Sequence, residues 1–308
     1  EGALTIGVDY TPDYYAPDTG ETGAINQHLA GVDAQLGIIM GGLQNKIING
    51  DFSIWQRGTS QTSSDYGSAD RWKLLHGGST TKTASRQSFT LGQTDVPGNP
   101  TYYLQHVVTS GSGAADYCYA QQRIENVAIL SGQTVTLSFW AKADATRSIS
   151  IEFVQHFGSG GSPSSDVTAI GAEKFSVSTS WQLITATVAI PSISAKTLGT
   201  DGNDYLALNI WFDAGSDSNS RTDSLGNQSG TFDIAQVQVE EGSVATPFFL
   251  RGYAEERRLC ERYFETSYSL GYYPGDTNID SCISFRSSSD TPYGYPSIGS
   301  RGFTVVKR

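Results

Sequence analysis

The chain has few of the residues that disulfide frameworks, zinc sites and membrane spans require. Its 308 residues include only three cysteines, Cys118, Cys260 and Cys282. These are too few and too scattered for a disulfide framework or a zinc site. No apolar run approaches the ~20 residues that a membrane-spanning helix needs. We therefore expect that the protein does not insert into a membrane. We also expect that it is assembled in a reducing compartment.

Positive charge is also scarce. Lysine and arginine together number 20 against 31 aspartates and glutamates, which gives a net charge of -11. Nucleic-acid affinity depends mainly on clustered Lys and Arg side chains that neutralise phosphates. We therefore expect no nucleic-acid partner.

Catalytic motifs are missing as well. The chain has no G-x-S-x-G elbow, H-E-x-x-H pair, phosphate-binding loop or G-x-G-x-x-G turn, and its four histidines stand apart. Glycoside cleavage needs two carboxylates held across a cleft, but spacing singles out no pair among Glu152, Asp213 and Glu240. The repeats of a β-helix are absent too. The sequence predicts a protein that is not an enzyme and has no cofactor or metal.

What the chain does contain is alternation of apolar and polar residues with period two, which is typical of half-buried strands. Around 234–235 the apolar phase shifts, which indicates a β-bulge. Between the strands lie loops rich in Gly, Ser and Asp, with no helical pattern. The sequence therefore predicts a mainly β fold, a jelly-roll β-sandwich over residues 45–250. The alternating segments are 135–142, 149–153, 184–190, 206–212 and 232–239.

Helical periodicity is confined to the flanks of this region. Residues 1–21 resemble an extended arm, and residues 22–44 carry a heptad seam whose Leu and Ile/Val pattern favours a trimer. An amphipathic helix lying on its own domain is the alternative. Residues 251–308 predict a helix followed by a partial β module. The predicted trimer interface consists of Ile25, Leu29, Val32, Leu36, Ile39 and Leu43.

The sandwich begins with the stretch NGDFSIWQRG. Asn49-Gly50-Asp51 is turn chemistry that admits unusual backbone angles. Phe52, Ile54 and Trp55 would then anchor a first strand to the sandwich. A structural role is therefore predicted for this stretch rather than contact with a ligand.

Strand phase also predicts a surface that could bind sugar, because aromatic faces pack on pyranose rings and amides or carboxylates bond their hydroxyls. If the strands share one sheet, Trp140 and Trp211 stand on one face near the polar residues. In a trimer the same face could instead be buried between protomers. The predicted carbohydrate-binding residues are Trp140, Trp211, Tyr205, Asn209, Glu152 and Asp213.

Several motifs, in order, carry a family resemblance: NGDFSIWQRG, SADRW (68–72), SFWAKA (138–143) and VQVEEGSVATPFF (237–249). The strand pattern resembles carbohydrate-binding jelly rolls of the galactose-binding-like type. With the segments around 27–37 and 255–265, the whole order is similar to bacteriophage tail-fibre and related virion fibre proteins. Ser53 stands where carbohydrate-binding relatives often carry a glutamate that helps to hold calcium, so no calcium site is expected.

The resemblance implies a homotrimeric virion fibre that binds host surface polysaccharide and contacts other virion proteins through its N-terminal arm. Such a protein would be assembled in the host cytoplasm and located in the phage particle. Two alternatives remain at this stage. One is a head-decoration or collar fibre with a purely structural packing role, and the other is a tailspike that depolymerises polysaccharide.

Overall fold

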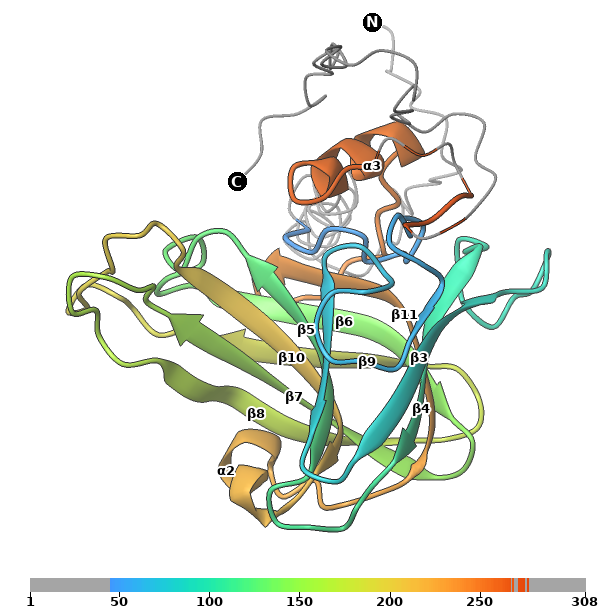
Figure 1. The fold of residues 1–308 in the computed structure, drawn as a ribbon, viewed down its shortest axis with the longest axis horizontal. Coiled ribbons are helices and arrows are strands. Elements are labelled where there is room, and N and C mark those ends of the chain that lie inside the picture. The colour runs from blue at the N-terminus through green and yellow to red at the C-terminus, as the bar shows by residue number, and fades with distance from the viewer. Residues whose placement is uncertain (1–44, 267, 269–270, 275, 277–308) are drawn as a thin grey trace, which may run out of the picture.

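The computed structural model describes residues 45–266, 268, 271–274 and 276 (Figure 1). Three predicted features lie outside these residues. They are the N-terminal arm (1–21), the heptad helix (22–44) with its whole trimer seam, and most of the small β module predicted after the second helix.

The described chain forms two antiparallel sheets packed face to face, so the predicted mainly β sandwich is confirmed. Strands that are distant in sequence are neighbours in each sheet, as in a jelly roll. The six-stranded sheet has the order β1 (Ser60–Gln61), β3 (Thr81–Ser88), β4 (Tyr102–Thr109), β11 (Gly230–Glu241), β6 (Thr134–Ala143) and β9 (Gln182–Ala189). The five-stranded sheet has the order β2 (Trp72–Gly77), β5 (Tyr117–Ile124), β10 (Tyr205–Ala214), β7 (Arg147–His156) and β8 (Val167–Val177).

The core lies between the two sheets and is built by alternate residues of each strand. Val135, Leu137 and Phe139 of β6 and Leu206 and Leu208 of β10 are all fully buried there. All five predicted strand segments lie in strands of the structure. The predicted bulge is present too, because the pairing of β11 with β6 shifts register between residues 235 and 238.

One prediction about strand arrangement is wrong. The carbohydrate-binding surface was expected to combine Trp140 and Trp211 on one sheet, but β6 belongs to the six-stranded sheet and β10 to the five-stranded sheet. Both residues point away from the core, so the sandwich separates them onto opposite outer faces. Strand phase shows which side of a strand faces the core, but not which sheet the strand joins.

The NGDFSIWQRG stretch closes one end of the sandwich as an irregular turn, not as the predicted strand. Asn49 has a left-handed backbone with φ of 57°, as its turn chemistry suggested. Its side chain bonds three backbone groups, donating from Nδ2 to the carbonyls of Ile54 and Asp70 and accepting from the Ile54 N–H, each at 2.9 Å. Phe52 stacks on Trp72 with ring centroids 5.3 Å apart. The predicted structural role fits these contacts.

Gly50 allows this turn to approach β11. A Cβ atom at residue 50 would lie 2.1 Å from the carbonyl oxygen of Val237, which is backbone and cannot swing aside. The Val237 N–H also donates to the Gly50 carbonyl at 2.9 Å.

Gly50→Ala should therefore destabilise the domain by about 1–3 kcal/mol, as overpacking in a core does. Urea unfolding would measure the loss. The control is Gly252→Ala, because Gly252 has neither a positive φ nor a neighbour near its Cβ position. Gly92→Ala is unsuitable because Gly92 has a left-handed backbone. A Gly50→Ala protein as stable as Gly252→Ala would contradict the close approach.

A helix packs on the same end as this turn, opposite the end that carries α2 (Asn219–Thr222) (Figure 1). It is α3 (Tyr253–Glu261), which accounts for the helix predicted after the sandwich. Arg251, just before it, donates from Nη1 to the carbonyl of Ile47 at 2.9 Å and from Nη2 to the carbonyl of Asn45. Arg251 also pairs with Glu256 at 3.1 Å. We call these contacts the end clasp.

None of the helices in the described part of the chain is long and apolar enough to cross a membrane.

Candidate functional site

A row of polar side chains crosses the outer face of the five-stranded sheet. The strand register places Lys73, Gln121, Asn209 and Glu152 opposite one another on β2, β5, β10 and β7. Their chain neighbours on these strands belong to the hydrophobic core, except for the fully buried Gln122, so the four side chains point to the opposite side. We call this set the polar row.

Hydrogen bonds link three members of the polar row, Gln121, Asn209 and Glu152, into one chain that begins at Arg123. Arg123 Nε donates to Gln121 Oε1 at 2.9 Å, and Gln121 Nε2 donates to Asn209 Oδ1 at 2.9 Å. Asn209 Nδ2 then donates to Glu152 Oε1 at 2.8 Å. Each amide donates at one side and accepts at the other, which fixes the orientation of both side chains.

Glu152 anchors this chain as a fully buried carboxylate. Besides Asn209, it accepts from the Ala169 N–H at 2.9 Å and from Arg221 Nε at 3.2 Å. Arg221 comes from α2, which packs against β8 and β7, and its side chain is 31% exposed while that of Glu152 is 0% exposed. A buried charge is tolerated when it is paired and hydrogen-bonded. The arginine thus covers one end of the polar row.

Two aromatic clusters flank the polar row along the strands. On one side Trp211 packs on Tyr119 at 4.3 Å between ring centroids, and the Arg221 guanidinium lies 5.0 Å from the Trp211 ring centroid. On the other side Tyr205 stacks on His156 at 4.6 Å. Tyr117 extends the first cluster, 5.6 Å from Tyr119.

The tryptophan and the tyrosines of the two clusters differ in burial. Trp211 is only 1% exposed, whereas Tyr205, Tyr117 and Tyr119 are partly exposed. Burial raises the pKa of Tyr119 to about 12, so its hydroxyl stays a neutral donor at physiological pH. The accessible part of the face is therefore a set of tyrosine rings with the guanidinium groups of Arg123 and Arg221, above buried amides.

Four of the six predicted carbohydrate-binding residues lie together on this face: Tyr205, Asn209, Trp211 and Glu152. Their contact with sugar stays a prediction. Trp140 lies on the other sheet, as described above. Asp213 is also displaced, because a bulge after Trp211 pairs it with the core residue Cys118. There it is fully buried and accepts from Thr80 Oγ1 at 2.7 Å and from the Gln228 N–H at 2.8 Å.

Several residues of the face were not predicted from the sequence. Gln121, Arg123 and Tyr119 lie on β5, whose inward residues include Gln122. Gln122 is fully buried and exchanges two hydrogen bonds with the backbone of Ile48, at 2.7 and 2.8 Å. An inward polar residue breaks the apolar alternation, so the strand signal at β5 was weak.

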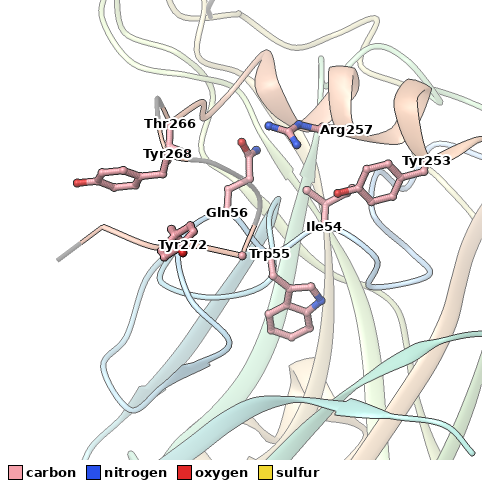
Figure 2. Close-up of a pocket in the computed structure, with 9 residues that line it drawn as sticks. Ile54, Trp55, Gln56, Tyr253, Arg257, Thr266, Tyr268 and Tyr272 are labelled. Atoms are coloured by element: carbon pink, nitrogen blue, oxygen red, sulfur yellow. The ribbon is translucent and has the colours of Figure 1, made fainter. Parts of the chain in front are cut away.

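A small pocket lies at the other end of the domain, between the opening turn and α3 (Figure 2). Trp55, Gln56, Tyr253 and Arg257 are among its lining residues, and its volume is about 30 Å³. Ligand pockets usually measure roughly 300–1,000 Å³, so this one has room for water but not for a sugar ring. Gln56 Nε2 is already bonded to Asp70 Oδ2 at 2.6 Å. The pocket is therefore a packing defect beneath α3 and not the candidate site.

No group of three or more His, Cys, Asp or Glu side chains that could hold a metal occurs among the residues described by the structure.

Comparison with known families supports a binding role for this fold. Residues 44–201, just over half of the 308, match the family described as "Carbohydrate binding domain". The chain belongs to this family. The match to the carbohydrate-binding domain includes strands β1 to β9, and β10 and β11 follow it to complete the two sheets.

Solved structures resemble part of the chain. One described as "CBM4 structure and function" is 16% identical and covers 63% of this chain and 98% of its own, with a TM-score of 0.34. The family 11 carbohydrate-binding module from Clostridium thermocellum, in complex with a mixed-linked tetrasaccharide, has 11% identity, coverages of 61% and 98%, and a TM-score of 0.35. The enzymatically active domain of bacteriophage CBA120 tailspike protein 4 is 13% identical, and the match covers 64% of this chain and 21% of that chain with a TM-score of 0.35. No curated protein matches the chain.

Proposed function

We propose that this carbohydrate-binding domain is the receptor-binding part of a homotrimeric phage fibre and attaches to polysaccharide on the host surface. Membership of the family supports glycan binding. The fibre context is supported by the order of sequence motifs, and the trimer by the heptad pattern of residues 22–44. The protein would be located in the virion, with residues 1–21 as the arm that joins it to other virion proteins.

The observation that carries the glycan-binding proposal is the polar row between two aromatic clusters. Partly exposed tyrosine rings offer apolar surface to the C–H groups of a pyranose, and the partly exposed guanidinium groups of Arg123 and Arg221 offer N–H donors. The two clusters lie on opposite sides of the polar row along the strand direction. A sugar chain that runs parallel to the strands and crosses the polar row could therefore contact both clusters. The face needs no catalytic group for this role, so we propose binding without cleavage.

Three copies on one axis would increase the strength of attachment. A single open face of this kind makes few contacts, and its affinity should be weak. Joining three faces makes the second and third binding events intramolecular, which can raise overall avidity by about 10²–10⁴ without any new contact.

A purely structural fibre, such as a head-decoration or collar protein, is the second candidate. It is favoured by the burial of Trp211, Asn209 and Glu152, which the chain's own α2 and Arg221 already cover. This role predicts that the intact trimer binds none of the polysaccharides on an array made from host surfaces.

A depolymerising tailspike is a further alternative, and it would release reducing sugar from the host polysaccharide. It has less support, because Glu152 and Asp213 are fully buried and occupied by internal hydrogen bonds.

Tyr205→Ala should weaken polysaccharide binding on the order of tenfold, since it removes a partly exposed ring beside the polar row that also packs on Arg123. Isothermal titration with a polysaccharide selected on the array would measure the change. Tyr102→Ala is the matched control, because Tyr102 is equally half-buried and also stacks on an arginine, but on the other sheet. Equal affinity of the two variants for the polysaccharide would contradict the proposal that the binding site lies on this face.

A further inference from the structure

The charges on the candidate face are nearly all paired within the protein. Lys73 lies 3.4 Å from Asp65, and His156 Nδ1 lies 2.9 Å from Asp166. Arg221 is bound to Glu152. These three groups have carboxylate partners, so a ligand gains little by offering them another carboxylate.

Arg123 differs from them. Among the described residues, no carboxylate lies within 4.0 Å of its guanidinium. Its Nε is bonded to Gln121, and its guanidinium carbon lies 4.3 Å from the ring centroid of Tyr205. No hydrogen bond of its two terminal nitrogens is found among the described residues, and the residue is partly exposed.

The surroundings hold Arg123 in a fixed place. Its carbonyl accepts a hydrogen bond from Arg71 Nη2, and Arg71 is itself held over the Tyr263 ring, 3.4 Å from the centroid. Arg71 is 7% exposed and adds a second positive charge close to Arg123. A guanidinium that is already oriented loses less side-chain entropy on binding, which favours affinity.

We propose that the glycan bound on this face is acidic, and that the free edge of the Arg123 guanidinium binds a sugar carboxylate. This inference rests on the proposed glycan-binding function and names its substrate class. The planar fork of arginine matches the two oxygens of a carboxylate and can bind both. The faces of the Tyr205 ring pack on His156 and Arg123, so the sugar would contact the edge of this ring beside the guanidinium.

The net charge of the chain does not prevent this. At physiological ionic strength, exposed charges more than about 8 Å apart are largely screened. The pairing of charges close to the sugar therefore decides the preference, rather than the overall excess of acidic residues.

The test compares one polysaccharide in two charge states. Uronic-acid-containing bacterial polysaccharides on an array would each be placed beside the same polymer with its carboxyl groups chemically reduced to alcohols. The intact protein should bind the acidic form on the order of tenfold or more tightly than the reduced form, as for a hydrogen bond to a charged group. Raising NaCl from about 50 mM to about 500 mM should weaken binding of the acidic form.

Arg123→Gln should weaken binding of the acidic form more than binding of the reduced form, and so remove this preference and the salt dependence. Arg123→Lys keeps the charge but not the fork, and should retain part of the preference. The matched control is Arg86→Gln, since Arg86 also stacks on a tyrosine, Tyr102, at 4.6 Å, but on the six-stranded sheet. If Arg123 only orients Tyr205 and Gln121, its replacement should instead weaken both forms equally.

The outcomes separate the two proposals. Equal binding of the acidic and reduced forms by the unmodified protein, or equal weakening of both by Arg123→Gln, overturns the acidic-ligand inference and leaves glycan binding intact. Binding of neither form, across the array, overturns the proposed function and the inference together.

Discussion

As the pH falls from 6.5 to 3, His106 should reduce the free energy of unfolding by on the order of 1.4 kcal/mol per pH unit. Burial, with a smaller contribution from nearby Lys82, lowers the pKa of His106 from 6.5 to about 3. In this window the unfolded chain binds a proton that the folded protein does not. The stability is therefore complete above pH 6.5 and is lost progressively as pH falls towards 3.

The structure explains this large effect. His106 is fully buried and stacked on Phe212 with ring centroids 4.4 Å apart, and neither ring nitrogen has a hydrogen-bond partner among the residues that the structure describes. Asp70 acts in the opposite direction, because burial raises the pKa of its carboxyl from 3.8 to about 6. Its folded form therefore takes up a proton first, which favours the folded state as pH falls through that range.

Two variants separate these contributions. His106→Leu should flatten the pH dependence of stability between pH 6 and 4, whereas Asp70→Asn should make the acid sensitivity greater than in the unmodified protein. Urea unfolding at a series of pH values would measure both. Unchanged pH dependence in His106→Leu would show that the histidine is not the buried neutral group described here.

The second large effect is expected from Arg221→Met, which should destabilise the domain by about 3 kcal/mol. Methionine keeps much of the apolar packing on Trp211 but removes the charge that pairs with the fully buried Glu152. Glu152 would then keep only Asn209 and the Ala169 N–H as partners. A buried carboxylate without its counter-charge is more costly than no carboxylate at all.

A double-mutant cycle tests this explanation. Adding Glu152→Gln to Arg221→Met should restore most of the lost stability, since it removes the unpaired charge. Arg147→Met is the matched control because Arg147 pairs with Asp144 at 2.9 Å, but both side chains are substantially exposed. Such surface pairs contribute about 0–1 kcal/mol. If Arg221→Met costs no more than Arg147→Met in denaturant unfolding, the pair is hydrated and the argument fails.

Much of the fold could be predicted because strand alternation reports directly on burial. In β10 the inward Leu206, Leu208 and Ile210 identified the outward Tyr205, Asn209 and Trp211 correctly. The same rule placed Glu152 on the outer side of β7, and register then brought it beside Asn209. Local periodicity was sufficient here because both strands are regular at these positions.

The errors came from features that periodicity does not contain. The sheet to which β6 belongs depends on long-range pairing, so Trp140, although outward as predicted, lies on a different sheet from Trp211. Asp213 was misplaced by a bulge that changes the phase of β10 after Trp211. The residues of β5 were missed because Gln122 points inward and satisfies its amide through the backbone of a distant segment.

The end clasp determines how the domain would respond to a pulling force. Asn45 and Arg251 are joined by a hydrogen bond, and Gln56 Nε2 is bonded to the carbonyl of Phe264 at 3.0 Å, so the chain enters and leaves the sandwich at one end. Tension applied through the two flanks would load the clasp and the packing of α3 first. The strands that carry the polar row lie outside this load path. In the proposed fibre, strain would therefore lengthen the domain at the clasp while the face that carries the polar row keeps its shape.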